Sequence, residues 1–162
     1  MSNERKFSPE TEAQFQKLLT RYPTRLAALI PTLWLGQEEF GHLDRTALAY
    51  VAERLELPMS QVVNTCTFYT MFTPVARGKF HIELCTNVAC WLRGCREIQQ
   101  VVEDELGLKH KQTSADGMFT YEEVECLAAC DKAPMCQVNG ADTYNLTPES
   151  FRELIRGLKS KG

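Results

Sequence analysis

Two pairs of cysteines are the residues of this chain whose type and spacing could do chemistry. Cys85 and Cys90 are separated by four residues, and Cys126 and Cys130 are separated by three. Four thiolates can hold a tetrahedral zinc ion, or a [2Fe–2S] cluster with two ligands on each iron. The spacing alone leaves both open, because short zinc loops are tolerated and loops of this length also leave room for a larger group.

The other three cysteines are expected to be structural. The chain has seven cysteines, and no apolar signal segment follows its charged N-terminus, so in a reducing cytosol a clustered set favours metal binding over disulfides. Cys66, Cys95 and Cys136 are interpreted as small buried apolar residues. Cys95 repeats the first spacing when counted from Cys90, but it should lie on the core-facing side of a helix.

Other kinds of active site are weakly supported. The sequence contains no Cys-x-x-Cys, which argues against a dithiol oxidoreductase, and no Gly-rich or Walker-type phosphate loop. The three histidines have no evident partner, and we interpret them as ordinary residues without a functional role: His42, His81 and His110. An electron carrier that lacks a substrate site needs a partner protein that has one.

Length and composition narrow the class of protein. The 162 residues suffice for one ordinary domain or two small ones, and 44% of them are hydrophobic. The net charge of −3, without a basic block, gives no indication of nucleic-acid binding. No apolar run approaches the roughly 20 residues that span a bilayer. We therefore expect a cytoplasmic protein without direct membrane insertion.

Residues 1–76 are predicted to form an N-terminal helical bundle. Four residues that can cap a helix each precede an apolar run at helical spacing: Ser8, Thr24, Asp44 and Ser60. Pro31 falls inside the second run and predicts a kink there. Pro74 is expected to end the fourth helix, and the segment that follows it is the candidate domain boundary.

From residue 79 the pattern alternates between strands and helices. Strands are expected at 79–84, 118–125, 135–138 and 141–144, and helices from about 92 to 106 and from Thr147 onward. The first two strands should be parallel, and Asn139-Gly140 predicts a hairpin between the last two. The fold class is thus α+β/α/β: a helical bundle followed, at 77–162, by a thioredoxin-like arrangement. Pro134 stands where that fold carries a proline, often cis.

Positive groups near the cysteines could interact with a bound anionic cluster. A helix that starts after Cys90 could direct its free N–H groups at a bound anion. Arg93, Arg96 and Lys132 are close in sequence, but charged side chains are mostly exposed. We therefore interpret these three as solvated.

The two cysteine motifs resemble those of a known family. Cys85-Thr-Asn-x-x-Cys90 followed by Leu-Arg-Gly, and Val-Glu-Cys126-Leu-x-x-Cys130 followed by Ala-Pro134-Met, resemble the cluster motifs of NuoE-type subunits. These are the [2Fe–2S] subunits of the NADH-dehydrogenase module of respiratory complex I. The segment 68–72 (Phe-Tyr-Thr-Met-Phe) and Gln-x-x-Phe-Gly at 37–41 are similar to the helical N-terminal part of that family.

The resemblance implies one [2Fe–2S] cluster held by Cys85, Cys90, Cys126 and Cys130, in place of zinc. It implies a helical domain and a thioredoxin-like ferredoxin domain. It also implies a NuoF-type flavoprotein partner that binds NADH and FMN and passes an electron to the cluster, so that the chain acts enzymatically only as a subunit, peripheral on the membrane through the complex.

Alternatives to complex I stay open. NAD-linked hydrogenases and formate dehydrogenases have equivalent subunits, and a zinc-stapled interaction module would use the same cysteines. The aromatic residues Phe68, Tyr69 and Phe72 are expected either to contact the flavoprotein or to lie in the core.

Overall fold

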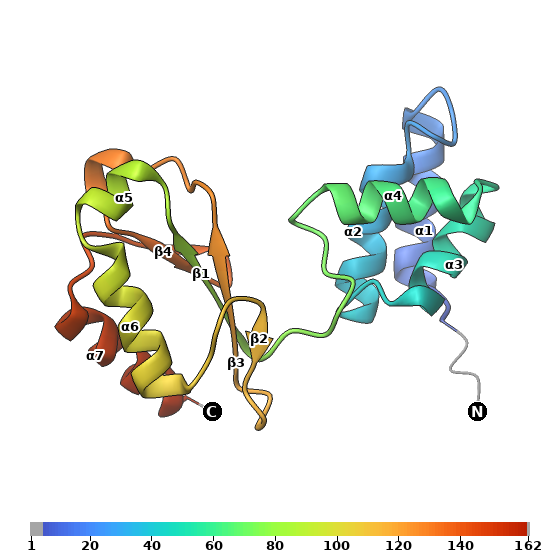
Figure 1. Cartoon of the computed structure of the whole chain (residues 1–162). Coiled ribbons are helices and arrows are strands. Elements are labelled where there is room, and N and C mark those ends of the chain that lie inside the picture. The colour runs from blue at the N-terminus through green and yellow to red at the C-terminus, as the bar shows by residue number, and fades with distance from the viewer. Residues whose placement is uncertain (1–4, 162) are drawn as a thin grey trace. The chain divides into compact units, whose positions relative to one another are not determined.

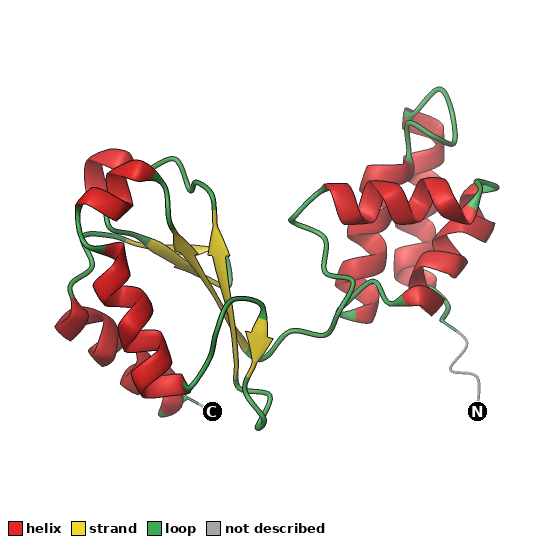
Figure 2. Ribbon diagram, viewed as in Figure 1, coloured by secondary structure: helices red, strands yellow, loops and turns green. Residues whose placement is uncertain are grey.

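The computed structural model describes residues 5–161 and divides into two compact units between Ala76 and Arg77. The first unit is built from helices, and the second combines one sheet with helices (Figures 1 and 2). Within the described residues, no helix is both long and apolar enough to cross a membrane.

The first unit contains four helices, and two of them begin where the sequence predicts. They are α1 (Pro9–Arg21), α2 (Leu29–Phe40), α3 (Arg45–Leu55) and α4 (Met59–Phe68). The backbone N–H of Thr11 donates to Ser8 Oγ at 3.3 Å, and that of Ala47 donates to Asp44 Oδ1 at 2.8 Å. Each cap satisfies an N–H group that has no partner inside the helix.

The other two helix starts were predicted wrongly. Helix α2 begins at Leu29 and not at Thr24, so Pro31 lies in its first turn and not in its interior. A proline is tolerated there, because the first N–H groups of a helix have no intrahelical acceptor. Helix α4 begins at Met59, after Pro58, and ends at Phe68, well before Pro74.

The core of the first unit shows which of the aromatic residues are buried. Phe72 is 2% exposed and packs 5.5 Å from the Trp34 ring, between centroids, so it is a core residue. Tyr69 is partly buried against the same core. Phe68, in contrast, is 76% exposed. Of the three, only Phe68 has most of its side chain exposed.

The second unit contains a five-stranded mixed sheet in the order β2-β3-β1-β4-β5. Strands β1 and β3 are parallel, as predicted, and the other pairs are antiparallel. Asn139 and Gly140 join β4 to β5 with φ of 50° and 79°, the left-handed conformation that the predicted hairpin turn needs. The strands are β1 (Phe80–Cys85), β2 (Gln112–Thr113), β3 (Phe119–Val124), β4 (Cys136–Val138) and β5 (Ala141–Thr143).

Helices α6 (Cys95–Leu106) and α7 (Pro148–Lys159) cover one face of this sheet (Figure 1). Ile82 and Leu84 of β1 alternate toward this side and pack in one core with Ile98 and Phe151. The helix predicted over about 92–106 is α6, which starts only at Cys95, and a further short helix that was not predicted, α5 (Val88–Leu92), precedes it. They are separated at Gly94, whose φ of 99° interrupts helical geometry.

Candidate metal centre

The two cysteine loops lie at the same end of the sheet. Cys85 is the last residue of β1 and pairs in register with Val124, the last residue of β3, while Cys126 follows two residues later. The N–H of Thr86 donates to Val124 O at 3.0 Å, and that of Cys85 donates to Met135 O at 3.1 Å. Both loops therefore follow the carboxyl ends of two neighbouring parallel strands, and the segment around Met135 lies beside the first of them.

The first cysteine pair is buried and in mutual contact. Cys85 is 3% exposed and Cys90 on α5 is 1% exposed, and both belong to one buried cluster. Burial, followed by the hydrogen bond with Cys85, raises the pKa of the Cys90 thiol to about 11, and a hydrogen bond from the Met135 backbone opposes this. Because a thiolate and not a thiol ligates a metal, binding at this pair must displace protons.

The second pair is exposed to solvent. Cys126 and Cys130 lie on the loop after β3, and Cys130 begins the short 3₁₀ helix η1 (Cys130–Lys132). Between them Ala128 adopts a φ of 58°, and its N–H donates to Cys126 Sγ at 3.3 Å.

The three basic residues near the site are exposed, as expected, and each also makes a contact within the protein. Arg93 Nε donates to Ala133 O at 2.7 Å. The Arg96 guanidinium lies 5.0 Å from the centre of the Trp91 ring, and Lys132 Nζ lies 4.5 Å from that of Tyr144. Arg93 thereby fixes the segment that precedes Met135.

A helix does begin after Cys90, a few residues later than expected: α6 starts at Cys95, which packs with Cys85 and Cys90. Helix α5 begins at Val88, so Cys90 lies within it and not before it, and α5 is only five residues long. A backbone donor to sulfur comes from Ala128, whose N–H donates to Cys126 Sγ.

Cys95 lies beside the first pair. It is 1% exposed and packs with Cys85, Cys90 and Met135, in a cluster separate from the main core that Ile98 joins. Cys95 is thus a buried core residue on a helix, as expected, although it packs in the cluster of Cys85 and Cys90 and not in that of Ile98. Cys66 and Cys136 are buried in the cores of the first and second units, as expected.

Replacing Cys95 by Ser is expected to leave metal content unchanged, because Cys95 begins α6 and lies outside the two loops. Visible absorption and the iron content of the purified variant would measure this. Cys66→Ser, buried in the other unit, is the matched control. Loss of colour in the Cys95 variant alone would place Cys95 in the ligand set.

The spacing of the donor groups bears on which metal each set could hold. A tetrahedral zinc site with Zn–S bonds of about 2.3 Å places every pair of sulfurs about 3.8 Å apart. Across residues 5–161, the one trio of possible ligand atoms that converges within 4.8 Å consists of His81, Glu83 and Glu122, and includes no thiol. The cysteines are thus not gathered as one tetrahedral set. Two loops on neighbouring strands suit a larger group with two ligands on each of two irons.

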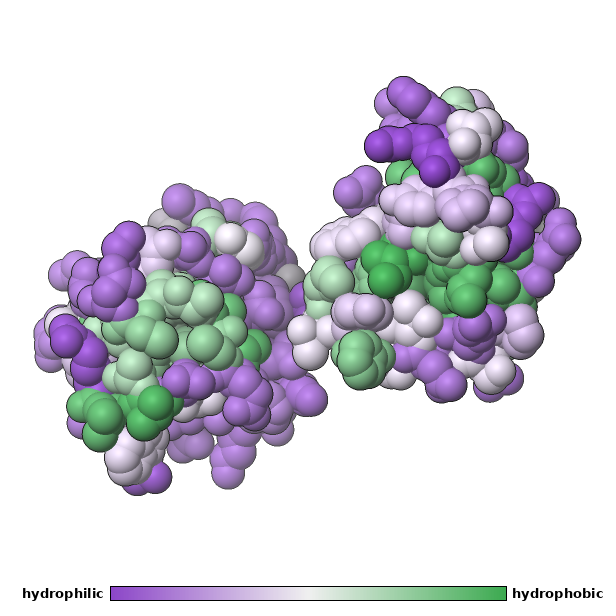
Figure 3. Space-filling view, turned by 90° about the horizontal axis from the view of Figure 1, so that it is seen from above, coloured by the Kyte–Doolittle hydropathy of each residue, from purple (hydrophilic) through white to green (hydrophobic). Residues whose placement is uncertain are grey.

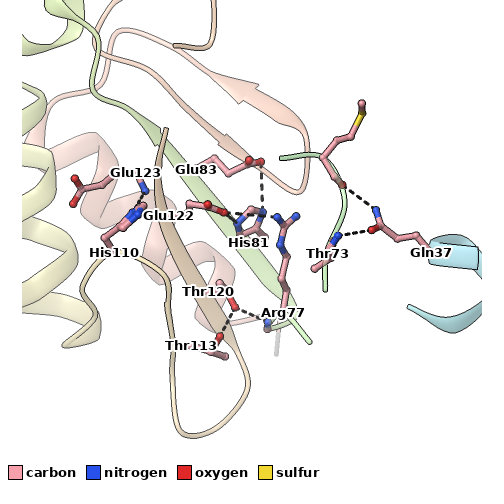
Figure 4. A network of polar contacts seen from close by, with 12 residues as sticks. Gln37, Thr73, Arg77, His81, Glu83, His110, Thr113, Thr120, Glu122 and Glu123 are labelled. Carbon is pink, nitrogen blue, oxygen red and sulfur yellow. Dashed lines mark hydrogen bonds and ion pairs between the residues drawn. The ribbon is translucent and has the colours of Figure 1, made fainter. Parts of the chain in front are cut away.

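The histidines are not the unpartnered residues that the sequence suggested. His81 lies between Glu83 and Glu122 (Figure 4). His110 Nδ1 accepts a hydrogen bond from the Glu123 N–H at 2.9 Å, and His42 Nε2 lies 3.7 Å from Asp44 Oδ2. No sequence motif identifies these partners, because they come together only through strand pairing and turns.

Comparison with known proteins places the chain in a family. The family model described as thioredoxin-like [2Fe-2S] ferredoxin matches residues 15–159. The chain is 39% identical over 143 residues to the E subunit of NADH-quinone oxidoreductase from Rickettsia prowazekii (strain Madrid E), covering 86% of this chain and 81% of the relative. It is 38% identical over 149 residues to the corresponding NADH-quinone oxidoreductase protein of Mycobacterium bovis (strain ATCC BAA-935 / AF2122/97), covering 92% of this chain and 59% of the relative.

A solved structure shares the fold. The NAD+-reducing [NiFe]-hydrogenase in its air-oxidized state superimposes with a TM-score of 0.70 at 22% identity over 85% of this chain, which spans 23% of the hydrogenase chain. This likeness concerns the fold alone. The family model and the relatives together show that the chain belongs to the thioredoxin-like [2Fe-2S] ferredoxin family.

Proposed function

We propose that the chain is the electron-transfer subunit of an NADH:quinone oxidoreductase and holds one [2Fe–2S] cluster through Cys85, Cys90, Cys126 and Cys130. The observation that carries the proposal is the meeting of the two cysteine loops at the ends of the parallel strands β1 and β3, in a member of a ferredoxin family. When bound, such a cluster takes up and returns a single electron. The two NADH-quinone oxidoreductase relatives named above support the assignment to this complex.

The chain's own residues would hold the ligands as thiolates and shield one side of them. The backbone N–H of Ala128 donates to Cys126 Sγ, and hydrogen bonds to sulfur are one of the factors that set a cluster's reduction potential. The pair Cys85 and Cys90 is buried, and the other pair is exposed. We infer that electrons enter from the exposed side.

We propose that this exposed side faces a NuoF-type flavoprotein that carries FMN and NADH, and that the chain reaches the membrane only through that complex. Hydrophobic side chains gather over the end of the second unit that carries α5 (Figure 3). On α5 itself, Val88, Trp91 and Leu92 are 66%, 49% and 73% exposed. Such a patch beside a functional site marks a protein contact. We propose a helical domain at 1–76 and a [2Fe–2S] domain at 77–162. Phe68 of the helical domain would add a further contact with the flavoprotein.

The first test is the metal content of the purified chain, with an EPR spectrum after dithionite reduction. Two irons and two sulfides per chain, with the signal of one reduced [2Fe–2S] centre, are expected. One zinc per chain, no colour and no signal would overturn the proposal and leave a structural module.

The partner is tested by co-purification with the NuoF-type flavoprotein. Leu92→Glu places a charge on the α5 patch, and because Leu92 is 73% exposed the change should not disturb folding. Capture should fall at least about tenfold, since burying an unpaired charge at an interface is unfavourable. Leu26→Glu, at a position 50% exposed in the first unit, is the matched control. Equal capture by both variants would remove α5 from the interface.

A further inference from the structure

We propose that His81, Glu83 and Glu122 form a second metal site in this chain, for a divalent first-row transition ion with Zn²⁺ preferred. The site would lie on the face of the sheet opposite α6 and α7. It shares no ligand with the cysteine loops and does not depend on what they bind.

Strand pairing brings the three side chains together. Side chains alternate between faces along a strand, so His81 and Glu83 of β1 lie opposite to Ile82 and Leu84, which pack in the core with α6 and α7. In the parallel register, His81 pairs with Thr120 and Glu83 pairs with Glu122. Glu122 therefore shares the face of His81 and Glu83, as Figure 4 shows.

His81 is the buried member of the trio. Its side chain is 6% exposed, and its Nε2 atom is buried without a hydrogen-bond partner. Nε2 lies 3.3 Å from Glu122 Oε2, and Nδ1 lies 3.5 Å from Glu83 Oε2. Burial, and next the charge of Arg77, lower the pKa of His81 to about 4, so the imidazole is neutral at pH 7. Neutral imidazole is the form that binds metals.

The two carboxylates lack a full complement of positive charge. Glu83 and Glu122 occupy paired positions on adjacent strands, where like charges destabilise a sheet. Arg77 Nη2 lies 3.7 Å from Glu122 Oε2 and is the nearby cation in Figure 4. The single positive charge of Arg77 cannot neutralise both carboxylates, and a bound divalent ion would neutralise them.

The donor set suits zinc better than calcium or magnesium. One ligand atom from each of the three residues can be chosen so that all lie within 4.8 Å of one another. A tetrahedral ion with bonds of about 2.1 Å to nitrogen and oxygen separates its ligands by about 3.4 Å, so only small side-chain movements are needed. Imidazole is a ligand for Zn²⁺, whereas Mg²⁺ and Ca²⁺ prefer oxygen alone. Three protein ligands leave a fourth position for water.

The test is equilibrium dialysis of the full chain against buffered free Zn²⁺, with metal counted by elemental analysis. The result is the difference in bound zinc per chain between variants, because zinc or iron on the cysteines contributes equally to all of them. The wild type and Glu123→Gln should each hold one zinc more per chain than His81→Gln and Glu122→Gln. Glu123 is the matched control, since it pairs with Leu84 and so belongs to the other face.

Arg77→Gln provides a change of opposite sign. The Arg77 guanidinium lies beside Glu122, where it would repel a bound zinc ion. Its removal should therefore tighten zinc binding at least about fivefold. A misfolded Arg77 variant could not produce this gain in affinity. If the variant of the buried His81 fails to fold, Glu122→Gln still tests the site, because it is a near-isosteric change at a side chain that is 21% exposed. Equal zinc in the wild type and Glu122→Gln overturns the proposal. A failure of the cluster assignment would instead appear as a shift in iron and zinc common to all variants.

Discussion

Replacing Cys126 by Ala is expected to abolish the native [2Fe–2S] cluster. Each ligand completes the coordination of one iron, so the loss of one thiolate leaves that iron exposed to water. Iron and sulfide per chain should fall from two each to near zero after purification in air, and the EPR signal after dithionite should vanish. Elemental analysis and EPR on the same sample measure both.

Cys126 is the best of the four positions for this test because it is exposed. Cys85 and Cys90 are buried, so truncating either would also leave a void and confuse lost metal with lost stability. Far-UV circular dichroism of the purified Cys126 variant should stay close to that of the wild type, because this exposed side chain is not part of the packed core. Cys66→Ala, in the other unit, is the control for altered thiol content. An unaltered EPR signal in the Cys126 variant would remove this residue from the ligand set.

The position of the candidate cluster site could be predicted because its signals are local. Each cysteine pair follows an alternating run, and an alternating run identifies a strand regardless of the rest of the chain. Once a helix separates two such strands, parallel pairing follows, and the two loops must share one end of the sheet. Cys85 at the end of β1 and Cys126 just beyond β3 satisfy this reasoning in the structure.

Boundaries and buried polar groups could not be predicted in the same way. The pattern gave no reason to break the helix at Gly94, since an isolated glycine is tolerated in a helix. Strand β2 consists of two exposed residues and has no hydrophobic pattern to detect. The surroundings of His81 depend on the register of β1 against β3, which places Glu122 next to Glu83 across 39 positions of sequence. Register is a property of the folded sheet.

Replacing Gly78 by Ala is expected to destabilise the second unit strongly. A Cβ atom at this position would lie 2.8 Å from the carbonyl carbon and 2.9 Å from the nitrogen of Phe119. Both are backbone atoms of β3, so no side chain can rotate away to relieve the contact. The N–H of Gly78 also donates to Thr120 Oγ1 at 2.7 Å, and a displaced strand would lose this bond.

The expected loss is about 1–3 kcal/mol, typical of overpacking, which lowers the melting temperature by roughly 5–20 °C for a unit of this size. Thermal unfolding followed by circular dichroism measures it. Gly157→Ala is the matched control, because Gly157 lies within α7 with no atom within 4 Å of an added Cβ, and alanine favours helix by roughly 0.5–1 kcal/mol. The two glycine-to-alanine changes should therefore shift the melting temperature in opposite directions. A Gly78 variant as stable as the wild type would show that β1 and β3 can separate at this end without cost, and would contradict the tight pairing that aligns Cys85 with the end of β3.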